Sequence, residues 1–223
     1  MAEPSFVLGV DLDGVCGDHT EAFRRVVAAE TGVDPATLGP QISWDFAEWG
    51  IDSDEFLRLH RIGVLERRMF AEMPVVPGAA EVLWRLSDAG VWIRLITHRL
   101  YASWGHATAV ADTVAWLDGN AIPYRDLCFL GHKPHVEADA YLDDAPHNIV
   151  ELRAAGATAI VFDQPYNRYV PGPRVRGWDE IEAVVLELVA GRGLAVQGRL
   201  DLPEDPGDRL RRPSGPRPRP DGS

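Results

Sequence analysis

The chain has 223 residues, of which 46% are hydrophobic and 25% are charged, as is typical of a folded globular protein rather than a disordered one. Acidic residues outnumber basic residues by 34 to 22, which gives a net charge of −12. Because nucleic-acid polymers and anionic membrane surfaces attract basic proteins, this charge argues against both as partners.

The two cysteines, Cys16 and Cys128, are too few for a disulfide framework, and no C-x-x-C pair indicates a zinc or redox site. The first ten residues lack the basic region and the long apolar run of a signal peptide. All apolar stretches are much shorter than a membrane span. We therefore expect a reduced, soluble protein of the cytoplasm.

The first predicted element is a buried strand over Phe6–Val10, which runs directly into Asp11-Leu12-Asp13-Gly14. A helix is expected over Thr20–Glu30, where apolar residues recur at helical spacing before a glycine. Residues 33–76 have a different character, because many aromatic residues stand among charges and are interrupted by Pro and Gly. This stretch is predicted to form a small helical insertion.

From Pro77-Gly78 onward, short apolar strands alternate with amphipathic helices. The predicted strands cover 91–96, 127–130, 140–142 and 159–162, and the predicted helices cover 79–89, 107–117, 148–155 and 181–190. This alternation predicts a three-layer α/β fold in which helices cover both faces of a parallel sheet. Such sheets bind their ligands at the carboxyl ends of the strands.

The alternation stops near Gly191, and residues 201–223 are rich in Pro, Arg, Gly and Asp without any apolar period. Such a composition cannot bury enough surface to fold alone. Residues 191–223 are therefore predicted to be a mobile tail.

Two carboxylates, Asp11 and Asp13, follow the first predicted strand. A lone D-x-D is also common in solvent-exposed turns. Directly after a buried strand, however, both acids stand at one edge of the sheet, where their mutual repulsion calls for a cation or a catalytic task. We interpret the pair as functional.

Two further strand ends carry groups that could hold an anion. Thr97 and His98 follow the second strand, where a hydroxyl and backbone N–H groups could bind an anionic oxygen, although a Thr there also commonly caps a helix. Lys133, the only lysine of the chain, follows the third strand and offers a compact positive charge. His132 and His135 form an H-x-x-H pair, but no convincing further ligands accompany them, so a zinc site is disfavoured.

The fourth strand ends in Asp143 and Asp144. Helix capping would explain only one of two adjacent acids. Together with Asp11 they load one edge of the sheet with negative charge, which a hard, oxygen-preferring cation such as Mg²⁺ would neutralise.

In chain order the strand ends therefore carry Asp11/Asp13, Thr97, Lys133 and Asp143/Asp144. This combination resembles the four motifs of the haloacid dehalogenase-like (HAD) hydrolase superfamily, over roughly residues 5–190. The resemblance implies a Rossmann-like catalytic core formed by residues 1–14 and 77–190, and a small helical cap formed by residues 15–76 inserted after the first strand.

The resemblance also implies a mechanism. Asp11 would attack phosphorus and form an aspartyl-phosphate, while Asp13 would act first as a general acid and then as a general base. Mg²⁺ would be held by Asp11, the main-chain carbonyl of Asp13, and Asp143 or Asp144, with Asp144 favoured by the resemblance. The phosphate oxygens would be held by Thr97, His98 and Lys133.

A narrower resemblance is to the 5′(3′)-deoxyribonucleotidase-like branch, the deoxy, cytosolic type C family. Its supporting residues are Asp11–Val15 with Asp18, the aromatics Trp44, Phe46 and Trp49, Pro77-Gly78, Leu142–Asp144 and Phe162–Asn167. Two positions depart from the family pattern: His19 replaces an aromatic residue that stacks on the base, and His98 replaces a serine.

The branch implies that a small phosphorylated substrate, a nucleotide, binds between core and cap. His19, Trp44 and Phe46 are candidate substrate-binding residues, although aromatics at such spacing also form the cap's own core. Residues 166–168 could reach the same opening. Two alternatives remain open: a phosphatase for another small phosphorylated metabolite, and a catalytically silent protein that binds a phosphorylated ligand.

Overall fold

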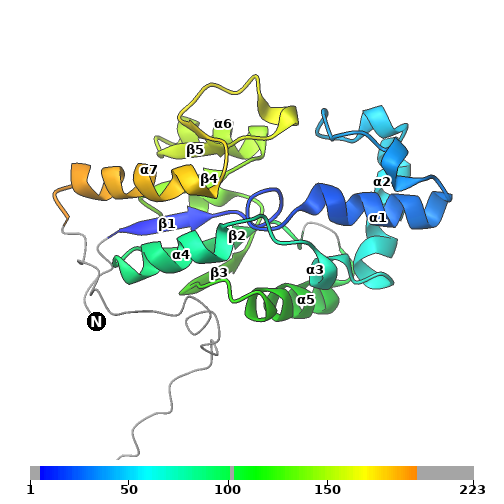
Figure 1. Ribbon diagram of the computed structural model, residues 1–223, viewed down its shortest axis with the longest axis horizontal. Helices are drawn as coiled ribbons and strands as arrows, with labels where there is room; N and C mark the ends of the chain where they lie inside the picture. Colours follow the sequence, from blue (N-terminus) through cyan, green and yellow to red (C-terminus); the bar gives the residue numbers. More distant parts are fainter. Residues whose placement is uncertain (1–5, 101–102, 195–223) are drawn as a thin grey trace, which may run out of the picture.

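The structure is a computed structural model that describes residues 6–100 and 103–194 (Figure 1). The part of the predicted tail beyond residue 194 lies outside the described residues. Among the helices described, none is long and apolar enough to cross a membrane.

The described strands form one parallel sheet of six strands in the order β3-β2-β1-β4-β5-β6. The strands are β1 (Val7–Val10), β2 (Trp92–Thr97), β3 (Asp126–Phe129), β4 (Ala140–Asp143), β5 (Ala159–Phe162) and β6 (Arg174–Val175). The first strand lies in the middle, with Val10 in register with Leu95 of β2 and Leu142 of β4. The residues that follow β1 and end its two neighbours therefore meet at one edge.

The sheet and its helices confirm the predicted three-layer α/β fold. On one face, α4 (Ala79–Asp88) and α7 (Trp178–Gly191) pack on a core that includes Leu8, Val10 and Leu95. On the opposite face, α6 (Pro146–Ala154) packs on a core that includes Ile96 and Tyr141. The inner strands β1 and β5 are apolar throughout because helices cover both faces of the sheet (Figure 1).

The predicted element bounds lie within three residues of the observed ones, and the predicted strand over 159–162 coincides with β5. The helix predicted over 148–155 begins at Pro146, because the first helical turn tolerates a residue without a backbone N–H donor. The last helix begins at Trp178 rather than Ile181, since its first turn is acidic and carries little apolar signal. The two-residue β6 was not predicted, because it is too short to show a period.

A helical segment follows β1 and lies to the right of the sheet in Figure 1. It contains α1 (His19–Thr31), α2 (Ser53–Leu65) and α3 (Met69–Glu72), with short 3₁₀ turns at Pro35–Thr37 and Ala47–Trp49. The Asp18 side chain accepts a hydrogen bond from the N–H of Glu21 and so caps α1, which ends at Gly32 in the left-handed region (φ 73°).

These helices form a second apolar core. Its members are contributed by α1, α2, α3 and the turns between them, with one residue from α5 (His106–Gly119): Phe23, Val26, Val27, Phe46, Ile51, Leu59, Val64, Met69, Phe70 and Ala109. The contact with α5 joins this segment to the helix that follows β2. A cavity can therefore form between the second core and the edge of the sheet.

Candidate active site

A cavity of about 330 Å³ lies between the carboxyl ends of the central strands and the helical segment. The sheet side contributes six predicted site residues: Asp11, Asp13, Thr97, His98, Lys133 and Asp144. The helical side contributes the three predicted substrate-binding residues: His19, Trp44 and Phe46. Asp143 does not line the cavity, but it contacts Lys133, which does.

Lys133 joins two of the carboxylates. Its ammonium Nζ lies 2.8 Å from Oδ1 of Asp11 and 2.5 Å from Oδ2 of Asp143, and its side chain is only 3% exposed. Asp143 accepts further hydrogen bonds from the backbone N–H of Ala145 and the side-chain amide of Asn148, so both of its oxygens are occupied. Asp143 therefore fixes Lys133 in place, and Lys133 in turn orients Asp11.

Asp144 is arranged differently. Its Oδ2 accepts the hydrogen of the Tyr166 hydroxyl, whereas its buried Oδ1 has no hydrogen-bond partner among the described residues. Gly14, at φ +78°, allows this close packing, because a Cβ on that residue would lie 2.1 Å from Oδ2 of Asp144. A buried carboxylate oxygen without a partner costs free energy unless something outside the chain coordinates it.

The donors fit a hard divalent cation. One ligand atom from each of Asp11, Asp143 and Asp144 lies within 4.8 Å of the others, and all three side chains are buried. No other such group of Asp, Glu, His or Cys was found among the described residues, His132 and His135 included. Oxygen-only donors of this type suit Mg²⁺ or a similar ion. Since both oxygens of Asp143 are occupied, Asp11 and Asp144 have the oxygens best placed for it.

The electrostatics of this cluster also favour a cation. Burial raises the pKa of Asp11 to about 7, with Lys133 opposing the rise and Asp143 and Asp13 adding to it. Burial and the neighbouring carboxylates raise the pKa of Asp144 well above its usual value. Burial alone would lower the pKa of Lys133, but its two carboxylate neighbours raise it. A bound cation would hold Asp11 and Asp144 ionised at neutral pH.

Asp13 has a partner that the sequence reasoning missed. Arg99 donates from Nη2 to Oδ1 of Asp13 at 2.6 Å and from Nε to Oδ2 at 3.0 Å. Burial alone would raise the pKa of Asp13, but the charge and hydrogen bonds of Arg99 hold it below its usual value. Arg99 stands two residues after Thr97, beyond a strand end, and this position could have identified it as a site residue. The sequence does not show that Arg99 is buried.

The hydroxyl of Thr97 is a second buried polar atom without a partner among the described residues. Thr97 is 1% exposed yet lines the cavity, so an anionic oxygen inside the cavity could accept its hydrogen. His98 also lines the cavity, and its ring lies against Gly131, where a Cβ would come within 2.5 Å of Nε2. Burial, with His147 and Lys133 nearby, lowers the pKa of His98.

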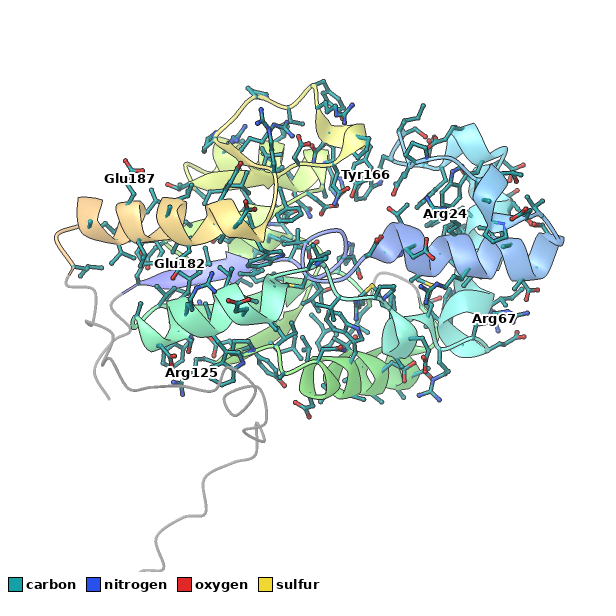
Figure 2. All side chains as sticks on the ribbon, in the orientation of Figure 1. Arg24, Arg67, Arg125, Tyr166, Glu182 and Glu187 are labelled. Atoms are coloured by element: carbon teal, nitrogen blue, oxygen red, sulfur yellow. The ribbon has the colours of Figure 1, made fainter. Side chains whose placement is uncertain are left out.

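The aromatic residues of the helical segment divide into two kinds. Phe46 is 2% exposed and packs on Phe23 and Trp49 with ring centroids 4.9 and 4.8 Å away, so it belongs to the second core while it lines the cavity. Trp44 is 50% exposed and meets Tyr166 edge-on, with centroids 5.5 Å apart. Figure 2 shows Tyr166 on the side of the core that faces α1 and α2.

Further lining residues were not singled out from the sequence: Gln41, Phe56, His60, Phe70 and His147. Of residues 166–168, Tyr166 lines the cavity, and Asn167 is buried behind it with its amide donating to the carbonyl oxygens of Asp144 and Phe162. Arg168 is not among the lining residues. The scattered positions of these residues along the chain hide their proximity.

Comparisons with known proteins place this chain among nucleotidases by sequence. Residues 5–192 match the model of the family "5′ nucleotidase, deoxy (Pyrimidine), cytosolic type C protein". A "Putative 5′(3′)-deoxyribonucleotidase" of Chlorobaculum tepidum is 41% identical over 192 residues, which cover 85% of this chain and 94% of that protein. A "Putative nucleotidase" of Oceanobacillus iheyensis is 31% identical over 115 residues, which cover 47% of this chain and 57% of that protein.

Solved structures share the fold at low identity. A haloacid dehalogenase-like family hydrolase of Streptococcus pneumoniae superposes with a TM-score of 0.53 at 14% identity, covering 81% of this chain and 98% of that one. A putative phosphatase of Clostridium difficile superposes with a TM-score of 0.57 at 15% identity, covering 82% and 100%. The resemblance to HAD hydrolases is confirmed at the level of the fold.

Proposed function

The chain belongs to the 5′ nucleotidase, deoxy (pyrimidine), cytosolic type C family, and we propose that it hydrolyses the phosphomonoester bond of deoxynucleoside monophosphates with the help of Mg²⁺. The observation that carries the proposal is the pairing of Asp11 with Lys133 beside the unpartnered oxygen of Asp144. In one cavity, this arrangement supplies a nucleophile, a positive charge for phosphate and a place for a cation.

Asp11 is the proposed nucleophile. One of its carboxylate oxygens forms a bond to phosphorus while the bond from phosphorus to the nucleoside oxygen breaks, which leaves an aspartyl-phosphate. Because Arg99 lowers the pKa of Asp13, it is the minor, protonated form of Asp13 that donates a proton to the departing oxygen. Asp13 then takes a proton from the water that attacks the aspartyl-phosphate, and this second step releases inorganic phosphate and restores Asp11.

Lys133 and Thr97 are the proposed phosphate-binding side chains, with His98 beside them. The Lys133 ammonium and the unpartnered Thr97 hydroxyl both border the cavity next to Asp11. Groups fixed in this way stabilise the charge that spreads over the phosphoryl oxygens in the transition state without having to reorganise.

The proposed metal ligands are carboxylate oxygens of Asp11 and Asp144, together with the main-chain carbonyl of Asp13 that the family resemblance implies. Asp143 serves this site indirectly, because its oxygens are taken by Lys133, Ala145 and Asn148. Held by these residues, a cation would neutralise phosphoryl charge and so reduce the repulsion between the phosphate and the Asp11 nucleophile.

Residues 15–76 are the proposed cap, and His19, Trp44 and Phe46 are its proposed substrate-binding residues. All three line the wall opposite the carboxylates. Burial lowers the pKa of His19 despite the opposing charge of Asp13, so its ring is neutral at physiological pH and can lie against a nucleobase. A predominantly aromatic wall suits a planar base better than a sugar, because every base has a π-face.

The test is phosphate release from a panel of deoxynucleoside and ribonucleoside monophosphates and sugar phosphates, with Mg²⁺ and with a chelator. We expect Mg²⁺-dependent release that favours deoxynucleotides. Release from sugar phosphates alone would support the proposed phosphatase mechanism but contradict the proposed nucleotide substrate. Absence of release from every compound, together with measurable binding of a nucleotide, would favour a silent phospholigand-binding protein.

The matching variant is Asp11→Asn, which keeps the shape of the side chain and removes the nucleophile. We expect it to lose turnover and to lose the phosphorylated protein that acid quenching traps from the wild type, as detected by mass spectrometry. A trapped phosphoryl group that persists in Asp11→Asn would assign the nucleophile to another residue.

A further inference from the structure

Arg99 lines the cavity, yet its side chain is only 1% exposed. It follows β2 and reaches across to Asp13 on the loop after β1, where its fork contacts both carboxylate oxygens. Parallel, two-point pairing of this kind fixes the plane of the carboxylate as well as its position.

The guanidinium is itself anchored on its other sides. Nη1 donates to the Thr113 hydroxyl of α5 at 2.9 Å, and that hydroxyl donates to the carbonyl oxygen of Ala109 at 2.7 Å. The ring of Phe70 from α3 lies under the guanidinium, 4.2 Å from its central carbon. Elements from the core and from the helical segment therefore hold Arg99 in one orientation.

We propose that Arg99 is a positioning residue: it holds the Asp13 carboxylate in the orientation in which Asp13 exchanges protons with the leaving oxygen and the attacking water. The inference rests on the proposed phosphatase function and adds to it a residue that acts only through Asp13. The fork supplies one hydrogen bond to each carboxylate oxygen, which leaves each oxygen a further lone pair, and Asp13 lines the cavity in which the proton transfer takes place.

The burial of Arg99 distinguishes this role from direct substrate binding. The guanidinium makes two hydrogen bonds to Asp13, one to Thr113 and a ring contact with Phe70, and a side chain so engaged and only 1% exposed offers almost no surface to a phosphate group. Fold stability is also a poor explanation, because replacing a buried ion pair by apolar side chains is often neutral or stabilising. The need to position Asp13 explains why the charged guanidinium of Arg99 is buried beside the cavity.

The experiment is a double-mutant cycle between Arg99→Gln and Asp13→Asn, measured with a nucleoside monophosphate, whose alcohol is a poor leaving group. In the wild-type background we expect Arg99→Gln to lower kcat about 10²-fold, because a misplaced proton donor loses about that much, and to leave KM within about threefold. In the Asp13→Asn background the same substitution should change the rate by less than about threefold.

A second measurement separates positioning from general damage. The first turnover of p-nitrophenyl phosphate needs no protonation of its leaving group, so Arg99→Gln should leave the burst of p-nitrophenolate within a few fold of wild type. The slower steady state, which requires Asp13 to activate water, should fall. Equal losses in the burst and in nucleotide turnover would overturn the proposal.

The matched control is Arg68→Gln. Arg68 also forks onto a buried aspartate, Asp112, which is adjacent to Thr113 on α5, but it does not line the cavity. We expect Arg68→Gln to retain wild-type kinetics. A loss of kcat equal to that of Arg99→Gln would show that both losses are merely structural effects.

Arg99→Lys keeps the positive charge but loses the two-point contact with Asp13. It provides a milder variant should Arg99→Gln not fold, and it should show the same non-additivity with Asp13→Asn.

Each outcome is informative. Additive losses in the cycle, or a rise in KM with kcat unchanged, would overturn the positioning role and assign Arg99 to substrate binding or to the fold. A wild-type protein that hydrolyses no phosphomonoester would instead overturn the proposed function, and this result differs from active wild type with an indifferent Arg99→Gln.

Discussion

Tyr166 donates its hydroxyl hydrogen to Oδ2 of Asp144, and this contact joins the loop after β5 to the carboxylate whose other oxygen has no partner in the described chain. The same tyrosine ring meets Trp44 of the helical segment edge-on. Tyr166 therefore orients a proposed metal ligand and supports a residue at the opening of the cavity.

Tyr166→Phe should weaken the affinity for Mg²⁺ about tenfold, because hydrogen bonds to ligating carboxylates fix their orientation. The ring that packs on Trp44 remains in this variant, so KM for the nucleotide at saturating Mg²⁺ should change little. The Mg²⁺ dependence of turnover measures the shift. Tyr169→Phe, on a neighbouring tyrosine that is 77% exposed, is the control and should behave as wild type.

The two adjacent acids at the end of β4 should respond differently to substitution. Asp144→Asn should raise the Mg²⁺ concentration needed for half-maximal activity at least tenfold. Even substitution of a residue that only hydrogen-bonds to a metal ligand typically lowers metal affinity by about that factor. Its folding free energy without metal should not fall, because the change removes repulsion with Asp11.

Asp143→Asn should instead destabilise the fold, by about 3 kcal/mol, because it leaves the buried Lys133 with one carboxylate. Chemical denaturation of both variants with chelator present measures the difference. If Asp144→Asn proved the less stable of the two, the division of roles between these acids would be wrong.

Trp44→Ala should raise KM for deoxynucleotides about tenfold with little effect on kcat, because an exposed ring at the cavity opening contributes binding alone. The same variant should leave KM for a sugar phosphate nearly unchanged. Leu57→Ala removes an exposed apolar side chain from α2, away from the cavity, and is the matched control. A similar rise in KM for both substrate classes would argue against base stacking.

His60 should make folding stability depend on pH. Burial lowers the pKa of His60 from 6.5 to about 3, so between these values the unfolded chain binds a proton that the folded chain does not. The contribution is therefore fully present above pH 6.5 and is lost as pH falls toward 3, with a limiting slope of about 1.4 kcal/mol per pH unit.

His60→Gln should remove that part of the acid sensitivity, which urea denaturation at a series of pH values would show as a flatter curve than wild type. Leu57→Gln, at an exposed and non-titrating position on the same helix, is the comparison and should retain the wild-type slope. An unchanged slope in His60→Gln would mean that His60 is protonated in the folded protein.

The sequence by itself determined the fold class and the meeting of the motifs. Continuous apolar strands alternating with helices predict a covered parallel sheet, and parallel strands bring their carboxyl ends to one edge. For that reason Asp11, Thr97, Lys133 and Asp144, which are spread over 134 positions (144 − 11 + 1), could be expected at one site, and the structure places them around one cavity.

Only the tertiary structure decided how these groups pair. The residue pattern alone does not distinguish Asp143 from Asp144, and only the family resemblance favours Asp144. Successive residues at a strand end point to opposite sides, so Asp143 meets Lys133 and Asp144 faces Tyr166. The partnership of Arg99 with Asp13 depends likewise on how the loops after β1 and β2 pack against α5. Which side chains become partners depends on where each side chain points and how deeply it is buried. Both are set by the packing of elements that are distant in the sequence, so neighbouring residues in the chain do not reveal them.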